Sequence, residues 1–164
     1  MRRSDRAQDG AFALDLIDRC TYGVVSVSTG EDTPYCLPLS LVRVEDRLYF
    51  HCAREGRKLD LLRKNPRVCV TFVGGSEPAF VAEQNMYTDY FQSVIVTGTA
   101  REVSAEAEKI AALRALCAKL TPQGMAGDSF DRAIARSLHV TSVWQIEMDQ
   151  ISAKAKLRRQ PSSS

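Results

Sequence analysis

The stretch YFHCAREGRKLDLLRKNP, residues 49–66, changes character halfway along. Its first residues are aromatic and apolar, which is typical of a buried strand. Leu59 and Leu62 then follow at helical spacing, which predicts a short basic helix that ends before the closing proline. His51 and Cys52 stand at the joint between the two, and a Gly-Arg-Lys triplet follows them. The sequence therefore places a histidine, a thiol and two cations where a strand passes into a helix.

The physical chemistry of this joint favours an anion. A helix that begins at residues 56–58 points its free backbone N–H groups and the positive end of its dipole toward the joint. Arg57 and Lys58 add full positive charge there, which is unfavourable until an anion such as phosphate binds. A neutral His51 could donate a further hydrogen bond. The alternative is that the two cations are solvated and His51 is a hydrogen-bonded core residue, which is the commoner outcome for an isolated Gly-Arg-Lys.

The rest of the sequence consists mainly of short strands, with few helices and no repeated alternation of strand and helix. Strands are predicted at residues 22–30, 35–44, 47–53, 67–75, 91–104 and 139–154, and helices at 11–20, 58–64, 105–121 and 129–138, with a less regular stretch at 76–90 and a loop at 122–128. Residues 35–44 and 47–53 read as a hairpin, and Pro38 inside the first run indicates a sheet edge or a bulge. Antiparallel hairpins dominate, so we expect a mainly β fold, a small antiparallel barrel with peripheral helices.

Composition and length exclude several classes of protein. The chain has 164 residues, which suits a single domain over residues 1–154 with a polar, disordered tail at 155–164. The formal net charge of +2 is too small to favour nucleic acid or an anionic membrane. No apolar run approaches the length of a membrane span, and no signal core follows the polar amino terminus, so we expect a cytoplasmic protein.

Metal and nucleotide motifs are missing from the sequence. The five cysteines are scattered, contain no C-x-x-C pair and read as reduced, buried thiols, which argues against structural zinc. No dinucleotide-binding or P-loop glycine motif occurs. A nucleophilic pair of His51 and Cys52 is disfavoured, because adjacent residues on a strand point to opposite faces.

The segment RLYFHCAREGRKLDLLRKNPRVCVTF, residues 47–72, resembles the FMN-binding split-barrel superfamily, whose best-known members are the pyridoxamine 5'-phosphate oxidases. The similarity is strongest to its 5-nitroimidazole-resistance (Nim-type) branch. Other pieces fit that branch in order: MRRSDR (1–6), CTYGVVSV (20–27), PLSLV (38–42) and SVIVTGTAREV (93–103) before a long helix. The resemblance covers nearly the whole chain, and residues 49–68 are its most specific part.

The resemblance implies a small antiparallel split β-barrel that forms a homodimer, with FMN in a groove between the two subunits. On this pattern Arg57 and Lys58 hold the phosphate. The flavin and its ribityl chain are lined by His51, Cys52 and Ala53.

The same pattern assigns two further contacts. The backbone of Pro38, Leu39, Ser40 and Leu41 would face the isoalloxazine ring, with Pro38 preventing normal strand pairing. Ser93 falls where the superfamily places a polar flavin contact, although an exposed hydroxyl at a strand start explains it equally well.

The implied function is that of an FMN-dependent oxidoreductase acting on a small molecule, with reduction of a nitroaromatic such as a 5-nitroimidazole as the most concrete reaction. Pyridoxamine phosphate oxidases carry a C-terminal segment with Trp and Arg that contacts the substrate and the flavin. In this sequence only Trp144 is present, and the segment AKAKLRRQ (153–160) does not match that pattern. This difference argues against pyridoxamine phosphate as the substrate. Two alternatives stay open: a non-catalytic FMN- or haem-binding protein of the same fold, and a flavin-free structural or regulatory barrel.

Overall fold

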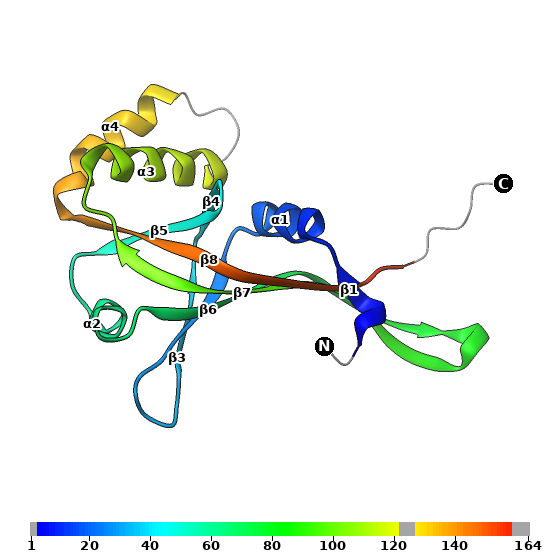
Figure 1. Ribbon diagram of the computed structural model, residues 1–164. Coiled ribbons are helices and arrows are strands. Elements are labelled where there is room, and N and C mark those ends of the chain that lie inside the picture. The colour runs from blue at the N-terminus through cyan, green and yellow to red at the C-terminus, as the bar shows by residue number, and fades with distance from the viewer. Residues whose placement is uncertain (1–2, 122–126, 159–164) are drawn as a thin grey trace.

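The structure is a computed structural model that describes residues 3–121 and 127–158 (Figure 1). Its helices are η1 (Ser4–Arg6), α1 (Gly10–Arg19), α2 (Arg57–Lys64), η2 (Ala82–Gln84), α3 (Glu106–Leu120), α4 (Gly127–Ser137) and η3 (Leu138–Val140). Its strands are β1 (Ala7–Gln8), β2 (Gly23–Val27), β3 (Tyr35–Leu39), β4 (Val42–Val44), β5 (Arg47–Ala53), β6 (Arg67–Val81), β7 (Met86–Glu102) and β8 (Thr141–Lys156).

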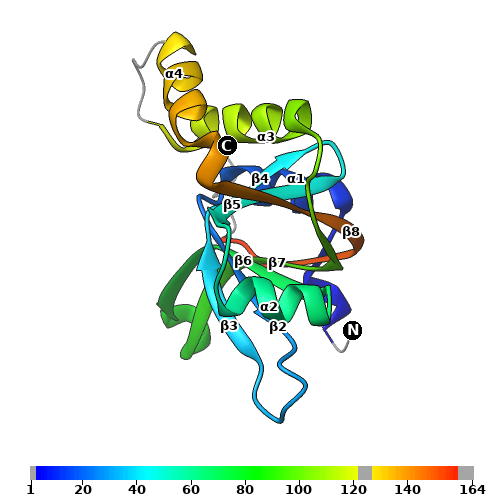
Figure 2. The same ribbon diagram turned by 90° about the vertical axis from the view of Figure 1, so that its left-hand side faces the viewer.

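The strands form one antiparallel sheet in the order β3-β2-β6-β7-β8-β5-β4, with β1 paired to β8. The sheet curls, so that apolar side chains of β2 and β5, which are not neighbours in the sheet, meet in one core. Figure 2 shows the helices arranged around this curled sheet. The prediction of a mainly β, antiparallel split barrel with peripheral helices is confirmed.

Two apolar clusters lie on opposite faces of β5. Leu48 and Phe50 point into the barrel, where they join residues of α1 and α2 as well as the sheet. Tyr49 points the other way, into a second cluster between β5, β8 and the helices α3 and α4. This alternation follows from the two-residue period of a strand, and it decides which way each side chain of the joint can point.

The predicted hairpin at residues 35–53 is only partly correct. β4 pairs with β5, but β3 pairs with β2 instead, and the chain leaves the sheet at Ser40 and the fully buried Leu41. β3 is an edge strand, which confirms the expectation drawn from Pro38. Proline lacks the N–H that a second neighbouring strand would need.

β6 and β7 are longer than predicted, and the expectation that β6 stops at its two glycines is wrong. β6 passes through Gly74 and Gly75 with a register shift, and α1 packs so closely there that a Cβ on Gly74 would clash with Leu16. Residues 76–90, predicted to be irregular, form a two-stranded hairpin that projects from the barrel (Figure 1). We call residues 76–90 the arm.

The ends of the predicted elements differ in smaller ways. Gly127 already belongs to α4, while residues 122–126 of the predicted loop lie outside the described residues. β8 continues to Lys156, and residues 159–164 of the predicted tail also lie outside them. Within the described parts of the chain, no helix is both long and apolar enough to cross a membrane.

The cysteines only partly match the expectation. All five are free thiols, as predicted. Cys20 alone is buried, whereas Cys36 on the edge strand β3 is exposed and the other three are half-buried.

Candidate cofactor site at the strand–helix joint

Gly56 makes the turn from β5 into α2. Its φ of 128° and ψ of 160° belong to a backbone region that is essentially restricted to glycine. The Gly56 carbonyl accepts the N–H groups of Leu59 and Asp60, at 2.8 and 3.2 Å, and no side chain caps the helix. The N–H groups of Arg57 and Lys58 have no preceding helical carbonyl to bond. The first turn of α2 therefore presents two backbone donors together with two cationic side chains.

Both cations rest on aromatic rings. The Arg57 guanidinium lies 5.1 Å from the ring centre of Tyr35 on β3, and the Lys58 ammonium lies 5.2 Å from that of Phe50 on β5. Among the described residues, neither cation has a carboxylate within ion-pair distance. Arg57 thus links the joint to the open edge of the sheet. Sequence reasoning did not identify Tyr35 or Phe50, because their approach to α2 depends on the folded barrel.

His51 and Cys52 point to opposite faces of β5, as expected. Cys52 packs against the barrel core, and burial raises the pKa of its thiol although Lys58 opposes this. His51 keeps much exposed surface, yet the protein packed around its ring, and then the Lys58 charge, lower the pKa of its imidazole. The lowered pKa favours the neutral imidazole, which donates a single hydrogen bond.

His51 also lines an apolar pocket of about 390 Å³ under α3 and α4. The walls are largely the side chains of Leu113, Leu116, Leu120 and Ile134, with hydroxyl groups from Thr121, Ser137 and Thr141. A volume of this size lies within the range of small-molecule sites. The pocket was not foreseen from the sequence, because α3 and α4 are far from β5 along the chain.

A hydrogen-bonded chain connects α2 to the end of the sheet. The Trp144 indole N–H donates to Ser142 Oγ at 3.0 Å, and Ser142 donates to Glu102 Oε1 at 2.6 Å. Arg63 of α2 donates to the same carboxylate at 3.3 Å. The hydrogen bond from Ser142, and then Arg63, lower the pKa of Glu102.

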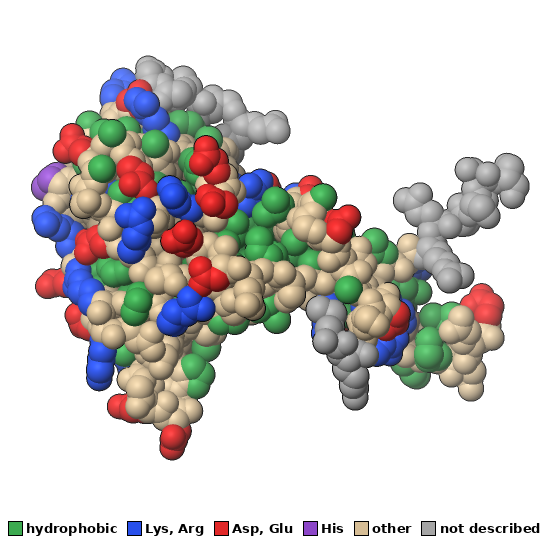
Figure 3. Space-filling view, in the orientation of Figure 1, with side chains coloured by type: hydrophobic (Ala, Val, Ile, Leu, Met, Phe, Trp, Pro, Cys, Tyr) green, Lys and Arg blue, Asp and Glu red, His purple; other side chains and the backbone are tan. Residues whose placement is uncertain are grey.

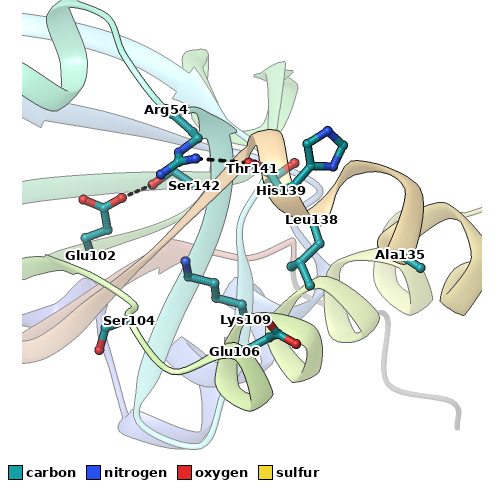
Figure 4. Close-up of a pocket in the computed structure, with 10 residues that line it drawn as sticks. All are labelled: Arg54, Glu102, Ser104, Glu106, Lys109, Ala135, Leu138, His139, Thr141 and Ser142. Carbon is teal, nitrogen blue, oxygen red and sulfur yellow. Dashed lines mark hydrogen bonds between the residues drawn. The ribbon is translucent and has the colours of Figure 1, made fainter.

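This chain of contacts borders a polar pocket of about 370 Å³ (Figure 4). Arg54 lies on its wall and donates to the His139 carbonyl at 3.2 Å. In the close-up, Lys109 reaches from α3 into the space below Ser142. Sequence reasoning did not identify the hydrogen-bonded group of Trp144, Ser142 and Glu102. The signal available in the sequence was the spacing of Ser142 and Trp144, which lie two residues apart on one strand and therefore share a face.

The predicted ring-facing segment lies along the open sheet edge. Pro38 and Ser40 are exposed, Leu39 is half-buried, and Leu41 is buried with its carbonyl accepting Lys119 Nζ at 2.8 Å. Pro38 pairs with Val24 on β2, and Val24 pairs in turn with Thr71 on β6, in the middle of the sheet. The segment is close to the joint because Arg57 lies over Tyr35 at the start of β3.

Ser93 is not close to the joint within one chain. It pairs with Val73 and Lys154, whereas the joint end of β7 is at Glu102. At about 3.3 Å per residue, the two positions are roughly 30 Å apart along the strand. Within one chain, Ser93 is therefore distant from the end of β7 that contacts α2.

The curled sheet, its open edge strand and the cationic joint define a class, the split barrels of the FMN-binding type. The family model described as pyridoxamine 5'-phosphate oxidase matches residues 9–155, and the chain belongs to that family. No curated protein sequence matches the chain.

Solved structures share the fold at low sequence identity. A candidate 5-nitroimidazole antibiotic resistance protein of Bacteroides thetaiotaomicron is 23% identical, with a TM-score of 0.74 over 90% of this chain and 84% of that one. A flavocytochrome of Azotobacter vinelandii is 22% identical, with a TM-score of 0.78 over 99% and 75%. The FAD and haem binding protein of Mycobacterium smegmatis is 18% identical, with a TM-score of 0.73 over 96% and 77%.

Proposed function

We propose that this chain is a homodimeric flavoprotein that binds FMN at the joint and uses it in redox chemistry on a small molecule. The observation that carries the proposal is the first turn of α2, where Arg57 and Lys58 lie beside the open strand β3 and form no ion pair with any carboxylate in the described part of the chain. Two cations and free backbone N–H groups at a helix N-terminus match a phosphate dianion.

The residues present fit FMN as a whole. With the phosphate at Arg57 and Lys58, the ring would lie along residues 38–41, because β3 leads away from the joint for about 13 Å at the usual rise of a strand. Pro38 leaves this edge without a partner strand. His51, Cys52 and Ala53 would lie beside the flavin where β5 ends. We propose FMN over FAD because the sequence resemblance is to FMN-binding proteins.

The dimer is proposed from the outer face of the sheet. Val24 and Ile95 are large apolar residues exposed there, and Thr71 lies between them in register. An uncharged, apolar patch of this kind favours association with a second copy. Ser93 shares this face with Ile95, so the partner's Ser93 would be able to approach the flavin.

Reduction of a nitroaromatic such as a 5-nitroimidazole is the reaction we propose. Bound FMN would supply the electrons, and the chain would orient it. The support is the Nim-type resemblance of residues 49–68. Trp144 is buried in the core, so it is not available to contact a pyridoxamine phosphate substrate. The neutral His51 is the side chain we expect to donate a hydrogen bond to the flavin or the substrate. We place the protein in the cytoplasm.

Absorption and rapid kinetics test this function. The purified protein should show flavin bands, and anaerobically reduced holoprotein should be reoxidised by a nitroimidazole faster than free reduced FMN in stopped-flow experiments. His51→Ala should slow this step while FMN stays saturating. Reoxidation no faster than that of free flavin, and unchanged in His51→Ala, would rule out this substrate.

A second candidate is a binding protein of the same fold without turnover, holding FMN or haem. The observation in its favour is His51 at the edge of the apolar pocket under α3 and α4. A Soret band in the protein as isolated would support haem. A colourless protein with no thermal shift on adding FMN would instead favour a flavin-free barrel.

A further inference from the structure

We propose that the arm of each chain crosses to its partner and completes the partner's flavin site with the side chains of Phe80 and Tyr87. This inference rests on the proposed function, since it assigns a role at the FMN site. It concerns residues far from the joint of their own chain. Figure 3 shows the hydrophobic side chains gathered on this projecting hairpin.

The arm has one covered face and one open face. On the first, Lys156 at the end of β8 and Arg158 just beyond that strand lie over the Tyr90 ring, at 5.6 and 5.1 Å. On the other, Phe80 and Tyr87 are cross-strand partners whose ring centres are 4.9 Å apart. These two rings are 51% and 85% exposed. An isolated two-stranded hairpin is only marginally stable in water, so we expect this open aromatic face to be covered.

The open face of the arm continues the proposed dimer face. Tyr87, Ser93 and Ile95 are separated by even numbers of residues on β7, so they share one side of the strand. A two-fold axis that lies just outside this face at Ile95, parallel to the sheet and perpendicular to β7, places the partner's β7 opposite with its direction reversed. At about 3.3 Å per residue, Tyr87 lies about 26 Å from Ile95 on one side, and Glu102 lies about 23 Å away on the other. The arm of one chain would therefore reach the joint of the other.

Charge favours the same arrangement. The arm carries three carboxylates (Glu77, Glu83 and Asp89) and no Lys or Arg, and Glu77 is ion-paired with Arg158 of its own chain. Residues 54–64, which include the joint, carry five cations and two carboxylates. Attraction between the two segments would orient the chains so that each arm lies over the other chain's joint.

Cross-linking tests the placement of the arm without relying on flavin. In a background in which Cys36 and the half-buried Cys52, Cys69 and Cys117 are replaced by Ser, Tyr87→Cys combined with Asp60→Cys should give a covalent dimer with a short bismaleimide, because the two positions are far apart in one chain. Each single cysteine variant, and Val44→Cys with Asp60→Cys, should give none. No covalent dimer from the Tyr87→Cys, Asp60→Cys pair would overturn the placement.

Complementation between two variants tests the contribution of the arm to the site. Phe80→Ser/Tyr87→Ser should weaken FMN binding about tenfold, as expected for two lost aromatic contacts, whereas the control Val44→Ser should not. A heterodimer can be formed from one Phe80→Ser/Tyr87→Ser chain and one Arg57→Ala/Lys58→Ala chain. If each arm completes the partner's site, one site of this heterodimer carries both defects and the other site is intact. The heterodimer should bind one FMN per dimer with wild-type affinity.

The outcomes separate the two proposals. A heterodimer without a tight site, or unchanged FMN affinity in Phe80→Ser/Tyr87→Ser, would overturn the role of the arm. Wild-type FMN affinity in Arg57→Ala/Lys58→Ala would instead refute the phosphate site of the proposed function, and cross-linking would then decide the placement of the arm.

Discussion

At the scale of single residues, the joint combines a backbone conformation that is restricted to glycine with positive charge and open backbone N–H groups. Gly56 adopts a backbone conformation that other residues avoid, and Arg57 and Lys58 place positive charge at the positive end of a helix. Such features persist when the surroundings or a ligand compensate for them. A bound phosphate would compensate for both the charges and the open N–H groups.

Removing both cations should therefore affect FMN much more than riboflavin, which has no phosphate. Charge-assisted hydrogen bonds are worth about 1.5–3 kcal/mol each, so Arg57→Ala/Lys58→Ala should weaken FMN binding at least about tenfold, most strongly at low salt. Fluorescence titration measures both ligands. Lys64→Ala, at the other end of α2, is the control, and an equal loss for FMN and riboflavin would exclude a phosphate site.

The His51 imidazole should titrate below its usual range in the protein without ligand. Because the folded state then binds fewer protons than the unfolded state below about pH 6.5, His51 makes stability decrease as the pH falls through that range. An NMR titration should give a pKa below 6.5. Lys58→Ala should raise it partway, and Lys64→Ala should change it less; a pKa above 6.5 in the wild type contradicts this account.

At the scale of elements, local signals were enough to predict the joint. Residues 49–66 contain the aromatic strand, the glycine and the helix with leucines at helical spacing. α2 begins one residue before its predicted start. The partner of β3 and the extent of the arm could not be predicted. Both depend on pairing between distant strands, and the glycines of β6 resemble a strand end in sequence.

The same reason explains what was missed at the site. The contact of Arg57 with Tyr35 joins segments that are adjacent only after the sheet curls, and the contact of Ser142 with Glu102 depends on the pairing of β7 with β8. Ser93 was assigned from resemblance, which carries no information about which chain supplies it.

The junction between β7 and β8 should be sensitive to one added carbon. A Cβ on Gly98 would clash with the Glu147 backbone carbonyl and come within 2.9 Å of Ile146 Cγ2, at the place where the register shifts. Gly98→Ala should lower the free energy of unfolding by about 1–3 kcal/mol, measured by urea denaturation. Gly10→Ala, with open space around its Cβ, should be neutral or stabilising. Equal stability of the two variants would contradict the packing described here.

At the scale of the whole molecule, one chain carries only part of the proposed site. Arg57 and Lys58 lie at one end of the sheet, and Ser93 and the arm lie toward the other. Two copies packed through the outer face would bring these ends together. Because FMN would then bind only the dimer, it should also stabilise the dimer by mass action.

Sedimentation velocity followed at the flavin absorbance band tests this central claim most directly. With FMN added at micromolar protein, the flavin signal should sediment as a particle of two 18.2 kDa chains. In Arg57→Ala/Lys58→Ala, most of the signal should stay at the speed of free flavin. Flavin that sediments with a single chain, or that remains free with the wild-type protein, would contradict a site shared between two subunits.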